Sequence, residues 1–92
     1  MSDQVPTPGR IVHYTLSEQD AARVKTQRGA NGNSLVGNFV MAGDVYPMVI
    51  VRVWGQGEHV NGQVLLDGSD TLWVTSVSEG EGERTFAWPR KG

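Results

Sequence analysis

The chain of 92 residues contains no cysteine. This excludes disulfide bonds, zinc ribbons, iron–sulfur clusters and catalysis by a thiol. There are two histidines, His13 and His59, and they lack the His-x-x-x-His spacing of a helical metal site. No serine stands in a Gly-x-Ser-x-Gly elbow, and no Gly-Lys-Ser/Thr phosphate loop is present. We therefore expect neither an enzyme, nor a metal site, nor a cofactor.

An excess of basic residues and a long apolar run are also missing. Eight Lys and Arg stand against ten Asp and Glu, which gives a net charge of −2 and a pI near 5.5. Domains that bind nucleic acid usually have a pI above ~9, so we expect no binding to duplex DNA or RNA. Residues 47–51 form the longest wholly apolar run, far below the roughly 20 residues that span a membrane. The first residues do not resemble a signal peptide, and we expect an intracellular protein without membrane contact.

Glycine, in contrast, is abundant. The 12 glycines lie mostly between short apolar blocks, which is typical of a small domain rich in turns. A chain of this length forms about one domain and buries only about 60–65% of its unfolded surface. We therefore expect one domain at residues 10–89, with a flexible arm at 1–9 and a free tail at 90–92. We also expect a homo-oligomer to add stability.

The patterning predicts one helix and five short strands in the order β-α-β-β-β-β, with a further short strand at residues 39–41. Ser17 is the expected helix N-cap, Glu18 and Asp20 lie in the first turn, and Gly29 ends the helix. Its thin apolar stripe suggests that it lies on the surface of another layer. Strands are predicted at residues 10–16, 39–41, 45–54, 60–67, 71–77 and 85–88. Residues 29–38 read as a flexible loop and 79–83 as an acidic loop.

The predicted fold class is α+β and mainly β. We expect a small antiparallel meander, or a partly open barrel of about five strands, with one short helix after the first strand. Asn61-Gly62 is a hairpin signal, but a turn at residues 55–59 fits the strand lengths better and makes Gly62 a bulge. Asp67 and Asp70 are interpreted as turn residues.

The strand at 45–54 is apolar on both faces. The two-residue period places Arg52 and Trp54 on the face of Met48 and Ile50, opposite Val49, Val51 and Val53. We expect the barrel core to cover one face, and the helix or a second subunit to cover the other.

Arg52 is the most informative residue, because an unpaired guanidinium is costly to bury. It is expected to pair with an acid, to be exposed at an edge, or to face a polar pocket. An arginine beside tryptophans can hold a planar anionic ligand. The alternative is a structural Arg–Asp pair, with the tryptophans filling the core and a subunit interface.

Several sequence segments of the chain resemble those of a group of small proteins encoded by tailed bacteriophages and prophages. They lie at residues 8–14, 43–54, 60–68, 72–77, 80–82 and 85–89. The stretch 28–37 departs from this pattern. The resemblance implies a phage accessory protein that acts in the host cytoplasm.

We therefore carry two hypotheses. In the first, the protein acts against host defence by sequestering a small nucleotide-type signal at an oligomer interface. Arg52 would hold phosphate, Trp54 or Trp73 would stack on a base, Asn61 or Thr75 would bond its edge, and Tyr14 and His13 would close the pocket. In the second, it is a protein–protein interaction module, either an inhibitor of a host factor or a minor virion component. The second hypothesis predicts an exposed apolar or aromatic patch.

Overall fold

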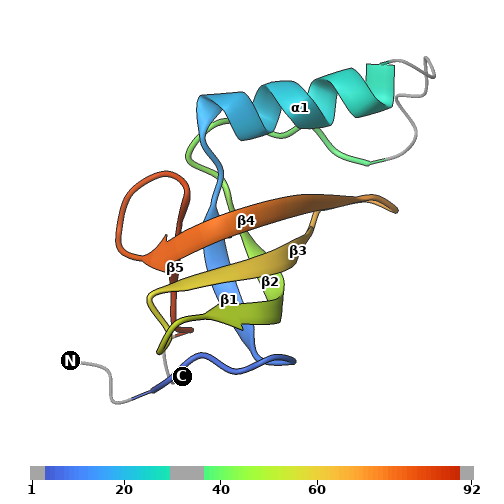
Figure 1. Cartoon of the computed structure of the whole chain (residues 1–92). Helices are drawn as coiled ribbons and strands as arrows, with labels where there is room; N and C mark the ends of the chain where they lie inside the picture. The colour runs from blue at the N-terminus through green and yellow to red at the C-terminus, as the bar shows by residue number, and fades with distance from the viewer. Residues whose placement is uncertain (1–3, 30–36, 90–92) are drawn as a thin grey trace.

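Five strands wrap into a closed barrel in the computed structural model, which describes residues 4–29 and 37–89 (Figure 1). The elements are β1 (Ile11–Thr15), α1 (Glu18–Gly29), β2 (Val45–Trp54), β3 (His59–Leu65), β4 (Thr71–Glu79) and β5 (Thr85–Ala87). Neighbouring strands are antiparallel except for β4 and β5, which run parallel. This confirms the predicted fold class. The barrel is closed because β5 also pairs with β1, where His13 faces Ala87 and Tyr14 faces Phe86.

The core fills the barrel and extends under the helix. Its buried apolar residues come from every element and from three connections: Val12, Tyr14, Leu16, Val24, Val40, Met48, Ile50, Val60, Val64, Leu66, Leu72, Val74, Val77 and Phe86. Figure 1 shows α1 as a separate layer above the strands. Val24 is the apolar helix residue that is fully buried.

The start of α1 is held by a reciprocal cap. The Ser17 hydroxyl oxygen accepts the backbone N–H of Asp20 at 3.0 Å, and Oδ2 of Asp20 accepts the backbone N–H of Ser17 at 3.0 Å. Two helix N–H groups that would otherwise lack partners are satisfied in this way. The predicted helix boundaries are therefore those observed.

A bulge in β2 changes which side chains point outward. Ile50 pairs with Gly62, and Arg52 pairs with Asn61, so Val51 is an extra residue. The bulge turns Arg52 and Trp54 to the outside and Val53 toward the core. The prediction that Arg52 and Trp54 share the face of Met48 and Ile50 is wrong, because an extra residue reverses the alternation beyond it.

The outward face of β2 is exposed to solvent in the single chain. Val51 is 49% exposed and Val45 is 53% exposed. The helix does not cover this face as one alternative predicted, because α1 lies across the top of the molecule in Figure 1.

Irregular pairing surrounds Gly62 on both sides. Val60 pairs with Val77 and Gly62 with Val74, so β4 also carries an extra residue, and Ser76 there has a φ of +55°. The sequence predicted a bulge at Gly62. The extra residues lie instead on β2 and β4. Gly62 is needed for close approach: a Cβ there would lie 2.6 Å from Cγ of Met48 and 2.8 Å from the Val49 oxygen. The predicted turn joins β2 to β3 at residues 55–58.

Three predicted segments differ from the structure or lie outside it. Residues 39–41 form no strand, because β1 already pairs with both β2 and β5 and offers no free edge; Gly37 instead forms an isolated bridge with Gly68. Most of the predicted loop at 29–38, and the tail at 90–92, lie outside the described residues. Residues 4–9 of the predicted arm run along the barrel, where Pro6 is buried and the Gly9 N–H donates to the Ile50 oxygen at 2.7 Å.

Candidate functional site

Arg52 and Trp54 form one stacked unit on the outside of β2. The guanidinium carbon lies 4.1 Å from the centroid of the Trp54 ring, which is a cation–π contact. The indole N–H of Trp54 donates to Oδ1 of Asn61 at 3.0 Å. The ring therefore has a fixed orientation, and it presents the guanidinium toward solvent.

Asn61 connects three strands at this position. Its Oδ1 atom also accepts the backbone N–H of Ser76 at 2.9 Å, so one oxygen ties the irregular part of β4 to Trp54 on β2. Asn61 is 8% exposed. Its Oδ1 atom is thus taken up by two bonds of the fold, and its predicted role in binding a base edge stays a prediction. Asn61 is a positioning residue for Trp54.

Arg52 has no carboxylate within 4.0 Å among residues 4–29 and 37–89. No Asp or Glu occurs in β2 or β3, and the acid in β4 is its last residue, Glu79, which pairs with β5. Glu58 in the adjacent turn accepts the backbone N–H of Gln56 at 2.7 Å, a bond that lowers the pKa of its carboxyl. Of the three arrangements expected for Arg52, the structure shows the exposed one, in which the guanidinium has no acid partner.

Other exposed apolar side chains lie on the same side of the sheet, on β2, β3 and β4. Trp73 and Trp54 are each 41% exposed, Val51 is 49% exposed and Leu65 is 39% exposed. Val49 faces Gln63, and Gln63 faces Trp73, so the register connects β2 to β4 across β3. We call Val51, Arg52, Trp54, Leu65 and Trp73 the outer face. Thr75 of β4 is also exposed, and its backbone oxygen accepts a hydrogen bond from Nη2 of Arg84 at 3.3 Å.

Tyr14 does not belong to this surface. It is fully buried, and its hydroxyl donates to Oδ2 of Asp20 at 2.5 Å. Burial, together with the hydrogen bond to Asp20, raises the pKa of the Tyr14 phenol. Its predicted role in closing a ligand pocket is therefore incorrect, because the alternation of β1 turns it inward with Val12.

His13 is exposed, but it lies elsewhere on the barrel. It pairs with Pro47 and Ala87 and lines an open groove of about 510 Å³ between β1, β5 and the loop before β5. Thr15, Val45, Gly80, Glu81, Ala87 and Trp88 complete the lining. The structure thus brings together Arg52, Trp54 and Asn61, with Trp73 and Thr75 on the neighbouring strand of the same sheet, and places Tyr14 and His13 apart from them.

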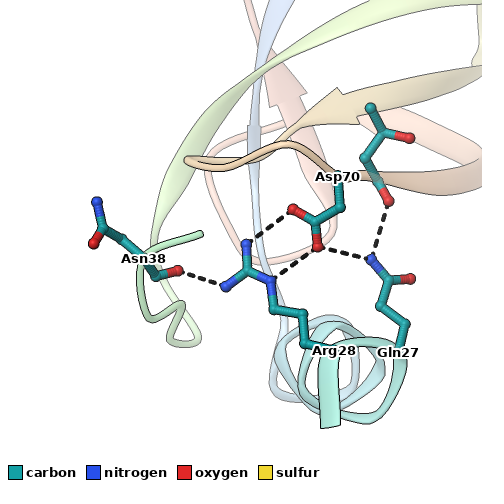
Figure 2. Close-up of polar contacts among 5 residues, drawn as sticks. Gln27, Arg28, Asn38 and Asp70 are labelled. Atoms are coloured by element: carbon teal, nitrogen blue, oxygen red, sulfur yellow. Dashed lines mark hydrogen bonds and ion pairs between the residues drawn. The ribbon is translucent and has the colours of Figure 1, made fainter. Parts of the chain in front are cut away.

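A polar clamp that sequence reasoning did not predict joins the helix to the β3–β4 connection (Figure 2). Arg28 donates to both carboxylate oxygens of Asp70, from Nε at 2.9 Å and from Nη2 at 3.0 Å, and its Nη1 donates to the Asn38 oxygen at 2.6 Å. Gln27 Nε2 donates to Asp70 and to the Thr71 oxygen, each at 3.2 Å. The structural Arg–Asp pair that was an alternative for Arg52 is thus made by Arg28.

In the described part of the chain, no three or more His, Asp or Glu residues gather as metal ligands, and no helix is long and apolar enough to span a membrane. The chain matches no protein-family model, and comparison with curated proteins and with solved structures finds no match either.

Proposed function

We propose that the protein is a non-enzymatic binding protein whose outer face docks a protein partner. The observation that carries this proposal is the exposure of Val51, Trp54, Leu65 and Trp73 on three adjacent strands. Single exposed apolar side chains are normal on a protein surface, whereas groups of them mark interaction sites.

The chemistry of the outer face suits protein recognition. Tryptophan and arginine are the residues most often found to dominate the binding energy of protein interfaces. The bond from Trp54 to Asn61 and the stacking of Arg52 fix two such side chains before binding. A fixed side chain loses less conformational entropy when the partner arrives, which favours affinity.

The test is selection of random displayed peptides on the immobilised full chain and on two variants. Trp73→Ser removes an aromatic side chain of the outer face. Phe39→Ser is the matched control, because Phe39 is 70% exposed but lies outside that face. We expect clones that bind the wild type and Phe39→Ser but not Trp73→Ser. No enriched clones, or clones that bind all three proteins equally, would contradict the proposal.

Sequestration of a small nucleotide is the second candidate function. It is favoured by one observation: the Arg52 guanidinium lies on Trp54 and has no carboxylate within 4.0 Å in the described part of the chain. Such a group binds phosphate well. Trp73 and Thr75 would then contact the base. A thermal-shift panel of cyclic dinucleotides and ADP-ribose derivatives tests it: a ligand at 100 times its Kd adds roughly 2.7 kcal/mol of stability. A flat response across the panel counts against it.

The biological setting is proposed from the phage resemblance. We propose an accessory protein that acts against host defence in the host cytoplasm, or a minor virion component. Mass spectrometry of purified virions separates these settings. The predicted homo-oligomer stays a prediction, and sedimentation equilibrium measures it.

A further inference from the structure

We propose that the partner presents a carboxylate to Arg52, from an Asp or Glu flanked by apolar side chains. This inference rests on the proposed function, because it assigns the chemistry of whatever docks on the outer face. The docking site is the outer face, and its occupant is an acidic and apolar segment of another protein.

The outer face contains one cation, Arg52, and no acid. The Arg, Lys, Asp and Glu residues of β2, β3 and β4 are Arg52 and the terminal Glu79. Arg52 lies between Val51 and Trp54, both substantially exposed, so a partner that covers these side chains also covers the guanidinium. A guanidinium removed from water without a counter-charge is costly, and a carboxylate from the partner offsets that cost.

The geometry of Arg52 is the second argument. A guanidinium that lies on an aromatic ring keeps its N–H groups in the plane and free for other partners. At 4.1 Å from the ring centroid, Arg52 can stack on Trp54 and still donate two parallel hydrogen bonds to one carboxylate. Because Asn61 fixes the Trp54 ring, the position of this donor pair is largely set before binding.

The same charge disfavours a second copy of the chain as the occupant. A symmetric dimer through this face would use the same surface on both copies. It would enclose two Arg52 side chains, and neither outer face contains an acid to neutralise them. Like charges without counter-charges oppose such an interface.

The experiment compares peptide selections on the wild type, Arg52→Gln and Arg52→Glu. Clones that need Trp73 should be enriched in Asp or Glu beside apolar residues on the wild type. Arg52→Gln should abolish the acidic preference, and Arg52→Glu should replace it with Lys or Arg. A purely structural role of Arg52 would not reverse the charge of the selected peptides.

Affinity measurements with altered peptides make the test quantitative. We expect Asp→Asn in a selected peptide to weaken binding to the wild type at least about 30-fold and to have little effect on Arg52→Gln. Arg10→Gln is the matched control. Arg10 is exposed and also stacks on a tryptophan, with its guanidinium carbon 4.9 Å from the Trp88 ring centroid, but it precedes β1. This variant should keep the acidic preference.

The outcomes separate the two proposals. Clones that need Trp73 but show no acidic preference would overturn this inference and leave the proposed function intact. The absence of any clone that needs Trp73 would contradict the proposed function itself. A dimer that Trp73→Ser dissociates would show that a second copy occupies the face, which would also overturn the inference.

Discussion

The Tyr14 hydroxyl donates a 2.5 Å hydrogen bond to Oδ2 of Asp20, joining the first strand to the first turn of the helix inside the core. The same carboxylate oxygen accepts the backbone N–H of Ser17. Strand, cap and helix therefore share one buried polar contact.

Replacing Tyr14→Phe should destabilise the fold by about 1–3 kcal/mol, because it leaves a buried carboxylate oxygen with one bond fewer. Urea unfolding at neutral pH measures the loss. Tyr46→Phe is the control, since the Tyr46 hydroxyl bonds Asp44 at a longer 3.2 Å in a less buried position. Equal stability of Tyr14→Phe and the wild type would show that the buried bond contributes nothing.

The clamp between Arg28 and Asp70 should make stability depend on pH in the acid range. The hydrogen bonds from Arg28 lower the pKa of the Asp70 carboxyl in the folded state. The stabilisation is therefore fully present above the pKa of an unfolded aspartate, about 3.9. It is lost as the pH falls through the lower pKa of the folded state.

Arg28→Ala should accordingly cost about 2 kcal/mol at pH 7 and much less below pH ~3. Urea unfolding of both proteins at several pH values measures the difference. Arg23→Ala is the control, because Arg23 is an exposed residue of the same helix. A difference between Arg28→Ala and the wild type that stays constant down to the acid limit would contradict the ion pair as its source.

Asn61→Ala should destabilise the barrel by roughly 2 kcal/mol, since two hydrogen bonds to the Trp54 indole and the Ser76 N–H are lost together. The Trp54 ring should also lose its fixed orientation, which near-ultraviolet circular dichroism detects. Gln63→Ala on the same strand and the same side of β3 should have little effect. Similar spectra and stabilities for the two variants would remove the role assigned to Asn61.

Gly62→Ala should destabilise by about 1–3 kcal/mol, because the new methyl group would meet the Met48 side chain and the Val49 oxygen at under 3 Å. Gly82→Ala is the matched control: its Cβ would meet nothing within 4 Å, and its φ is not in the left-handed region. Thermal unfolding should separate the two variants by several degrees. A Gly62→Ala protein as stable as Gly82→Ala would contradict the close packing of β2 on β3.

Local signals in the sequence predicted much of the fold. Strand β2 spans the ten residues expected from its β-branched pattern, and Ser17 and Gly29 marked the helix ends. The bulge at Val51 was not predictable in this way, because it depends on how Asn61 and Gly62 pair across the sheet. The bond between Arg28 and Asp70 joins residues 42 positions apart, so no local pattern indicates it.

The candidate site was predictable to a similar extent. Arg52 and Trp54 lie two residues apart in one strand, and the expectation that they share a face holds because both follow the bulge. Tyr14 was misplaced although a signal existed: Val12, Tyr14 and Leu16 alternate with His13 and Thr15, and this pattern turns the tyrosine inward.

Calorimetric titration of a selected peptide into the wild type, Trp73→Ser and Phe39→Ser tests the central claim most directly. Truncating a tryptophan that contributes much of the binding energy should raise the Kd by about 30-fold or more. Phe39→Ser, which removes an exposed aromatic side chain outside the outer face, should leave the Kd within about twofold of the wild type. Equal affinity of the wild type and Trp73→Ser would contradict binding at the outer face.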